Sequence, residues 1–156
     1  MIRPATSADI PTILHLVREL AAFEREPDAV TASETDLHAA LFGPRPAAEA
    51  VIAQEDDAVL GFALFFHNFS TWTGKRGLYL EDLYVTPAAR GQGIGTALLR
   101  HLAQEAVARG CARFEWSVLD WNADAIAFYR AMGAVGMEEW TIQRVTGEAL
   151  ERLARG

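Results

Sequence analysis

The chain has a single cysteine among its 156 residues, so it cannot form an internal disulfide bond. Cys111 opens an apolar segment after Gly110, where we expect a small buried side chain rather than a nucleophile. Apolar runs are short and fall below the roughly 18 residues of a membrane span. The N-terminal residues lack the apolar core of a signal peptide. These absences predict a soluble, cytoplasmic protein without disulfides.

Metal-ligand patterns and internal repeats are also missing. The chain has four histidines that share no metal-ligand spacing, and we expect no metal: His15, His38, His67 and His101. Basic residues are outnumbered, with 14 Lys and Arg against 21 Asp and Glu, which gives a net charge of −7. This charge disfavours nucleic acid as a partner and permits cationic substrates. The length suits one domain that covers residues 1–156.

Apolar periodicity and capping residues predict an α/β fold with a mixed sheet. Ile2 and Arg3 begin a strand, and a cap near Thr6 to Asp9 precedes a helix that runs to about Arg25. Ser33 and Asp36 form a capping-box variant at the start of a second helix. Further elements are expected over these ranges: strands 50–53, 59–66 and 78–85, a helix over 94–110, a strand over 114–118, a helix over 122–133, a strand over 137–145 and a helix over 148–154. The order is β-α-α-β-β-β-α-β-α-β, with 114–118 parallel to 78–85.

The most informative feature of the chain is a glycine-rich turn between a strand and a helix. Gly91, Gly93 and Gly95 permit positive φ and let main-chain N–H groups approach a ligand without interference from Cβ atoms. The helix that follows adds unpaired donors and the positive end of its dipole. This combination predicts a binding site for phosphate, although a cluster of helix-capping glycines without a ligand is the alternative.

Two common phosphate-binding motifs do not fit this turn. A Walker A loop needs Lys and then Ser or Thr after its last glycine, and here Gly95 is followed by Thr96 and Ala97. The dinucleotide fingerprint fails because its sixth position is Thr96 or Leu98 rather than Gly or Ala. What remains is Arg90-x-x-Gly93-x-Gly95, which resembles the pyrophosphate signature of the GCN5-related N-acetyltransferases.

The resemblance extends over nearly the whole chain. It includes Ser70-Thr-Trp72, Gly74-Lys75, Tyr79-Leu-Glu-Asp82, Asp120-Trp-Asn122 and Phe128-Tyr129, and it points to the spermidine/spermine and thialysine N-acetyltransferase branch. The resemblance implies the acyl-CoA N-acyltransferase fold, acetyl-CoA as cosubstrate and a homodimer. It implies cofactor binding by the main chain of one strand, by the turn and by a helix cap: Leu83, Tyr84, Val85, Arg90, Gly91, Gln92, Gly93, Ile94, Gly95, Thr96 and Asn122. Amides of the strand are also placed to polarise the thioester carbonyl.

Tyr129 matches the tyrosine that serves as general acid in the family, where it would protonate the departing thiolate. The alternative is a purely structural role, because Ala125, Phe128, Tyr129 and Met132 form an apolar helical stripe.

Glu81 is the candidate base that removes a proton from the substrate ammonium group. Strict alternation places it on one face with Tyr79, Leu83 and Val85, while Asp82 points the other way unless a bulge intervenes. Apolar neighbours would raise the pKa of the carboxyl, which suits a base near neutral pH. An ion pair with Lys75 or Arg76 is the structural alternative.

The resemblance further implies that Glu24 and Trp72 bind substrate together with Glu81. Glu24 follows Phe23 at the end of the first helix, and Trp72 would contact the amine through its ring or would simply pack under the Gly74 turn. Polyamine-acetylating relatives carry an acid two positions before the tryptophan, where this chain has Ser70. We therefore expect a small cationic amine or amino acid first and polyamines second. The rival functions are protein or peptide N-acetylation and non-catalytic binding of coenzyme A, and the presence of both Glu81 and Tyr129 argues against the latter.

Overall fold

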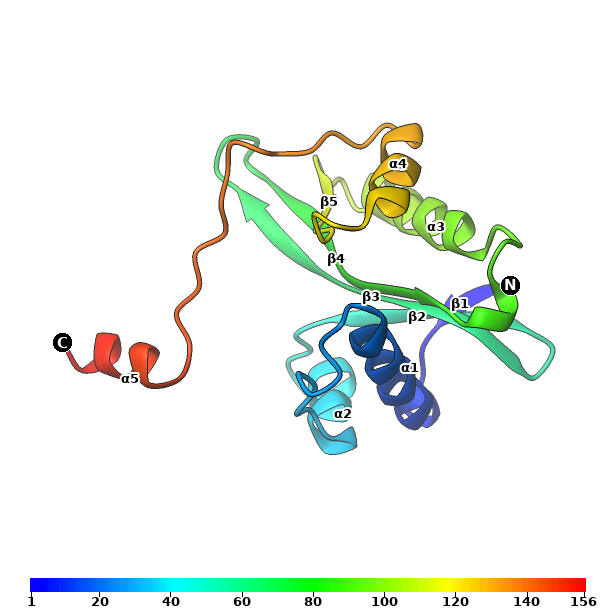
Figure 1. Ribbon diagram of the computed structural model, residues 1–156, viewed down its shortest axis with the longest axis horizontal. Coiled ribbons are helices and arrows are strands. Elements are labelled where there is room, and N and C mark those ends of the chain that lie inside the picture. The colour runs from blue at the N-terminus through cyan, green and yellow to red at the C-terminus, as the bar shows by residue number, and fades with distance from the viewer. The chain divides into compact units, whose positions relative to one another are not determined.

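A five-stranded mixed sheet is the centre of the N-terminal part of the molecule (Figure 1). The computed structural model describes residues 1–156, which divide into the compact parts Met1–Leu119 and Asp120–Gly156. The strands of the first part are β1 (Ile2–Pro4), β2 (Glu49–Glu55), β3 (Ala58–Ser70), β4 (Lys75–Val85) and β5 (Phe114–Trp116). Its helices are the 3₁₀ turns η1 (Ser7–Asp9) and η2 (Pro87–Ala89), with α1 (Ile10–Phe23), α2 (Glu34–Phe42) and α3 (Ile94–Ala108). None of the helices in the chain has the length and apolar character needed to cross a bilayer.

The strands lie in the order β1-β2-β3-β4-β5. The first four are antiparallel to their neighbours, and β5 is parallel to β4, as the intervening helix α3 requires. Leu78 pairs with Phe114, and Leu80 pairs with Trp116. The fold class expected from the sequence is confirmed, and the hairpin of β3 and β4 is longer than expected because it continues to Ser70 and Lys75.

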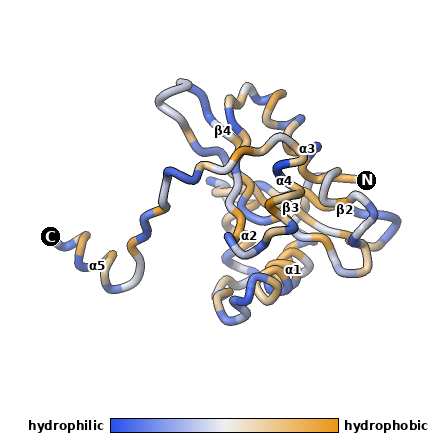
Figure 2. The backbone as a smooth tube through the Cα atoms, turned by 45° about the horizontal axis from the view of Figure 1, so that its top comes forward, coloured by the Kyte–Doolittle hydropathy of each residue, from blue (hydrophilic) through white to orange (hydrophobic).

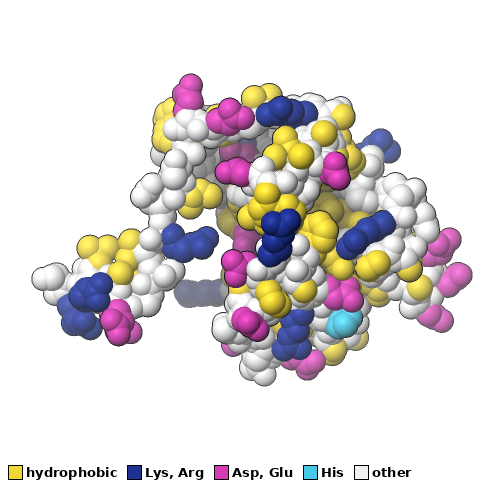
Figure 3. All heavy atoms as spheres, in the orientation of Figure 1, with side chains coloured by type: hydrophobic (Ala, Val, Ile, Leu, Met, Phe, Trp, Pro, Cys, Tyr) yellow, Lys and Arg dark blue, Asp and Glu magenta, His cyan; other side chains and the backbone are white.

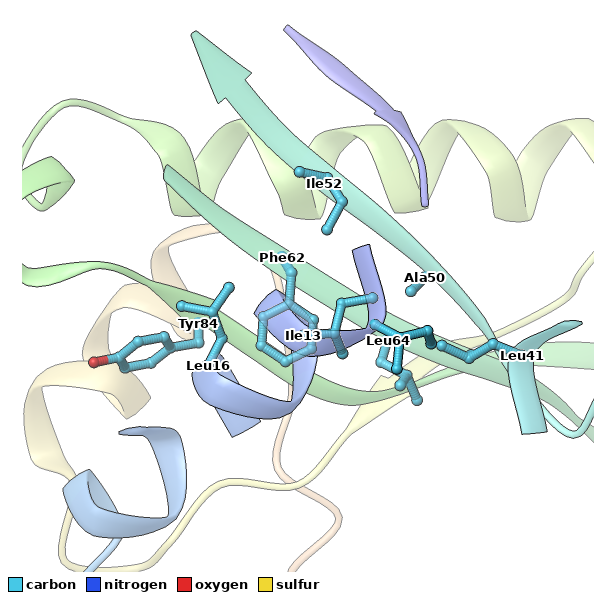
Figure 4. Packing of buried hydrophobic residues seen from close by; sticks show 9 residues of the cluster. Ile13, Leu16, Leu41, Ala50, Ile52, Phe62, Leu64 and Tyr84 are labelled. Atoms are coloured by element: carbon cyan, nitrogen blue, oxygen red, sulfur yellow. The ribbon is translucent and has the colours of Figure 1, made fainter. Parts of the chain in front are cut away.

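The two faces of this sheet are covered by different helices. Helices α1 and α2 lie on one face and α3 on the other (Figure 1). The apolar stripe of α1 packs into a cluster with Phe62 and Tyr84, which face each other across β3 and β4 (Figure 4). Ile13 and Phe62 are fully buried, and each buried side chain of this size contributes about 1.5–3 kcal/mol. This packing fixes α1 against β3 and the C-terminal end of β4.

Local capping interactions explain where the first two helices begin. The amide of Asp36 donates to Ser33 Oγ (3.1 Å), and the amide of Ser33 donates to Asp36 Oδ2 (2.9 Å), so the expected capping box is confirmed. Before α1, Arg3 makes a bidentate pair with Asp9 (2.8 and 2.9 Å), and the amide of Thr6 donates to the same carboxylate. The Arg3 guanidinium is the main cause that lowers the pKa of Asp9 to about 2.

The C-terminal part contains α4 (Ala123–Ala131) and α5 (Gly147–Arg155). The strand expected over residues 137–145 is absent, and this prediction was wrong. A strand needs a neighbour to satisfy its amides, and residues 120–156 contain only helices and irregular segments. Both polar and apolar residues occur along residues 137–145 and α5 (Figure 2). The apolar side chains of Trp140 and Ile142 are exposed.

Candidate functional site

The glycine-rich turn between β4 and α3 has the backbone conformation that the sequence predicts at two of its three glycines. Gly91 and Gly93 both have φ of +80°, and Gly93 is the N-cap of α3. A Cβ at either position would meet no atom of the chain within 4 Å, so conformation rather than crowding requires glycine there. Gly95 differs from the expectation, because it is helical and lies against Val85 and Leu83.

The main-chain donors of the turn precede the first hydrogen bond of the helix. The amide of Ala97 donates to the carbonyl oxygen of Gly93 (3.0 Å), and the amides of Ile94, Gly95 and Thr96 precede this first α-helical bond. Ile94 is the first residue of α3, Thr96 lies in its first turn, and the Gln92 side chain donates to the carbonyl of Ala88 (3.4 Å). The arrangement is that of an anion-binding helix N-terminus.

The second part of the site is the free edge of β4. This strand pairs with β3 as far as Val85 but with β5 only from Leu78 to Leu80. The side chains of Leu83 and Val85 lie on the α3 side, within 4.0 Å of where a Cβ on Gly95 would be, and Tyr84 points to the opposite face. Main-chain groups of residues 83–85 on the β5 side therefore have no strand partner.

A β-bulge places Glu81 out of the regular alternation of β4. Leu64 pairs with Asp82 and Phe65 pairs with Leu80, so Glu81 is the additional residue. Beyond the bulge the facing is reversed, and Asp82 shares with Tyr84 the face that α1 covers. The expectation that Glu81 shares a face with Tyr79, Leu83 and Val85 is wrong for this reason, because Leu83 and Val85 face α3.

The bulge brings Glu24, Glu81 and Asp82 into one electrostatic cluster. Burial, together with the charges of Glu81 and Glu24, raises the pKa of Asp82 to about 6. Burial and the charge of Glu81 also raise the pKa of Glu24. The structure thus brings together two of the carboxylates that the sequence singled out and adds Asp82. The sequence shows that Glu81 and Asp82 are adjacent acids, but it does not show that both belong to one acidic cluster. That arrangement depends on the bulge, and the bulge depends on how β4 pairs with β3.

Arg90 connects this cluster with the glycine-rich turn. Its guanidinium carbon lies 5.5 Å from the ring centre of Phe23 and 5.3 Å from that of Tyr84. Its Nε donates to the carbonyl oxygen of Val85 (3.1 Å). Burial raises the pKa of the Tyr84 phenol, the nearby Glu19 carboxylate adds to this, and Arg90 opposes it. The Arg90 side chain therefore contacts both the end of α1 and β4, the strand that carries Glu81 and Asp82.

Acidic side chains are spread over the region of α1 and α2 in Figure 3.

Trp72 is not brought near the carboxylates within this chain. It lies in the exposed turn between β3 and β4, and its ring is 6.0 Å from the guanidinium carbon of Arg113. The strand from Lys75 to Glu81 separates this turn from the bulge, a length of about 20 Å at 3.3 Å per residue. Its assignment as a substrate-binding residue stays a prediction.

Asn122 and Tyr129 belong to the C-terminal part. Asn122 caps α4, because its Oδ1 accepts a hydrogen bond from the amide of Ala125 (3.3 Å). Tyr129 is partly buried, and its ring centre lies 5.5 Å from that of Phe128. Asn122 is therefore a cap as expected, while its contact with coenzyme and the acid role of Tyr129 stay predictions.

A mixed sheet with an open strand edge, followed by a glycine turn at a helix N-terminus, defines an α/β domain whose exposed main-chain donors suit an anionic ligand. Residues 14–134 match the model of the acetyltransferase (GNAT) family, and the chain belongs to this family. It is an enzyme of the N-acetyltransferase class.

Similar proteins match the chain over nearly its whole length. The thialysine N-epsilon-acetyltransferase of Bos taurus is 40% identical over 165 residues, which cover 99% of this chain and 96% of that protein. The L-ornithine N5-acetyltransferase of Arabidopsis thaliana is 33% identical and covers 97% of this chain and 86% of its own length. Among solved structures, an integron cassette protein from the mobile metagenome of V. cholerae has a TM-score of 0.83 at 31% identity and covers 100% of this chain and 98% of that one.

Proposed function

We propose that this enzyme transfers the acetyl group of acetyl-CoA to a primary amine of a small cationic substrate, either a thialysine-like amino acid or a diamine. The observation that carries the proposal is the cluster of Glu24, Glu81 and Asp82 beside the free edge of β4. Two similar proteins are named for amino acids with a side-chain amine, thialysine and ornithine, and this supports an amino acid before a polyamine.

The turn and the strand edge fit the coenzyme. Amides of residues 90–96 would hold its diphosphate, because Gly91 and Gly93 adopt positive φ and carry no Cβ that would keep a ligand from the main chain. Main-chain groups of Leu83, Tyr84 and Val85 would pair with its amide-bearing arm. The bound coenzyme supplies an acetyl group that is activated as a thioester.

The carboxylates serve the amine. Three ionised carboxylates repel one another, and a bound ammonium group relieves that repulsion. An amine with an ordinary pKa near 10 must lose a proton before it attacks, so a proton acceptor is required. We propose Glu81 as this acceptor, acting directly or through water. Asp82 holds the cation and is the second candidate, because its pKa of about 6 suits proton transfer near neutral pH. Tyr129 is proposed as the general acid.

The test is release of free thiol from acetyl-CoA in the presence of thialysine, lysine, ornithine, putrescine, spermidine and short peptides. We expect the fastest release with an amino acid that carries a side-chain amine, and slower release with the polyamines. Preference for peptides would replace the proposal with protein N-acetylation. Binding of acetyl-CoA without turnover of any amine would indicate a non-catalytic coenzyme A sensor.

A further inference from the structure

We propose that a cavity at the turn end of the β3–β4 hairpin binds one small tetrahedral oxyanion such as a phosphate group. The cavity has a volume of about 70 Å³ and lies between the hairpin and the residues that lead into β5. Three basic residues line it: Lys75, Arg76 and Arg113. It is separate from the glycine-rich turn, since the strand β4 lies between them (Figure 1).

The charge of this cavity is opposite to that of the whole chain. The protein carries a net charge of −7, yet three cations and a single carboxylate, Glu115, line the cavity. Glu115 accepts a hydrogen bond from the side-chain amide of Asn68 (3.4 Å). None of the three cations takes part in an ion pair of the structure. Arg76 makes only a minor contribution to the lowered pKa of Glu49, whose main partner is Arg109. An anion would therefore supply the missing countercharge.

The walls of the cavity are held by main-chain contacts. The amide of Leu78 donates to the carbonyl of Arg113 (2.9 Å), and the amide of Ala112 donates to that of Arg76 (3.3 Å). A Cβ at Gly77 would crowd Asn68 Oδ1, so the Asn68 side chain would have to shift beside the cavity. The ring of Trp72 lies under the Arg113 guanidinium. The main-chain bonds fix the walls of the cavity and the Trp72 ring orients the Arg113 guanidinium, which lowers the cost of binding.

The size of the cavity suits a phosphate. A water molecule requires roughly 10–15 Å³ of such space, so a cavity of about 70 Å³ has room for a single phosphate group. Hydroxyl groups of Ser70 and Thr73 also line the cavity. Guanidinium groups bind phosphate in a bidentate manner, and the lysine adds a point charge.

Lys75 is the only lysine of the chain, so the reactivity of its side-chain amine reports on this cavity alone. The protein is treated with a water-soluble N-hydroxysuccinimide ester, and acylation of Lys75 and of the Met1 amino group is followed by peptide mass spectrometry. The reaction is run in sodium chloride, sodium acetate or sodium phosphate at equal ionic strength. We expect phosphate at ten times its Kd to slow acylation of Lys75 by about tenfold, while acylation of Met1 is unchanged.

Two variants localise the effect. Arg113→Gln and Arg76→Gln should each remove the protection, whereas Arg100→Gln, which changes an exposed arginine on α3, should retain it. Equal acylation of Lys75 in phosphate and chloride overturns the proposal, and so does equal protection by acetate. Acetyl transfer is measured separately, so loss of this site and loss of the proposed activity are distinguishable.

Discussion

The guanidinium group of Arg90 lies over the ring of Tyr84, with 5.3 Å between its central carbon and the ring centre. Arg90 opens the glycine-rich turn, and Tyr84 follows Asp82 by two residues on β4. The same guanidinium also contacts Phe23, the neighbour of Glu24. The residue that the family signature assigns to the coenzyme therefore also supports the two elements that carry the acidic cluster.

Replacing Arg90 with lysine should weaken both the glycine-rich turn and the packing that supports the acidic cluster. A lysine keeps the charge but loses the planar stacking on Phe23 and Tyr84 and the Nε bond to Val85. Cation–π contacts contribute about 0.5–2 kcal/mol, so we expect the KM for the amine to rise by about 2- to 30-fold. Steady-state kinetics at saturating acetyl-CoA measure this, with Arg100→Lys as the matched control. An unchanged KM would show that Arg90 serves the coenzyme alone.

Glu81→Gln should lower the rate of acetyl transfer near neutral pH, because the ammonium group loses its proton acceptor. The loss should diminish as the pH approaches the pKa of the amine, where the substrate deprotonates unaided. General-base roles of this kind contribute about 10²- to 10⁴-fold to the rate. The check is a profile of kcat/KM against pH for both proteins. A rate that is insensitive to the mutation and to pH would remove Glu81 from this role and leave Asp82.

Asp82→Asn should change how stability depends on pH. The pKa of Asp82 in the folded state, about 6, lies above its ordinary value of 3.8. Between these pH values the folded chain binds more protons at this site than the unfolded chain, so the free energy of unfolding falls as the pH rises. The cost at pH 7 is at most about 3 kcal/mol. The variant should lack this decline and should be more stable than the parent at pH 7.

Urea unfolding at pH 4, 5, 6 and 7 measures this difference, with Asp57→Asn as a control at an exposed hairpin position. If Asp82→Asn and the parent show the same pH slope, the raised pKa is not present in the folded protein.

Tyr129→Phe should lower kcat while leaving the affinity for acetyl-CoA nearly unchanged, because the substitution removes only a hydroxyl group. An effective general acid contributes about 10²- to 10⁴-fold. Single-turnover kinetics and calorimetry with acetyl-CoA separate the two quantities. Phe128→Leu tests the neighbouring ring as a packing control, and normal turnover in Tyr129→Phe would assign Tyr129 to the apolar stripe of α4 instead.

Features that depend on local chemistry were predictable from the sequence. Gly91 and Gly93 have positive φ as expected, and Ser33 forms its capping box, because each depends on a few adjacent residues. The bulge at Glu81 depends on which residues of β3 face it, which strict alternation within one strand does not reveal. The strand expected over 137–145 was wrong because apolar spacing alone provides no pairing partner.

The central claim is that main-chain donors of residues 90–96 hold the diphosphate of acetyl-CoA, and calorimetry of acetyl-CoA binding tests it most directly. Gly93→Ala and Gly110→Ala both place alanine at positive φ, +80° and +72°, at opposite ends of α3, and neither Cβ meets an atom of the chain within 4 Å. Each substitution should cost about 1–2 kcal/mol of stability. We predict that acetyl-CoA binds the parent and Gly110→Ala alike and binds Gly93→Ala about tenfold more weakly or worse. No heat of association with the folded parent protein, or equal affinity for all three proteins, would contradict the claim.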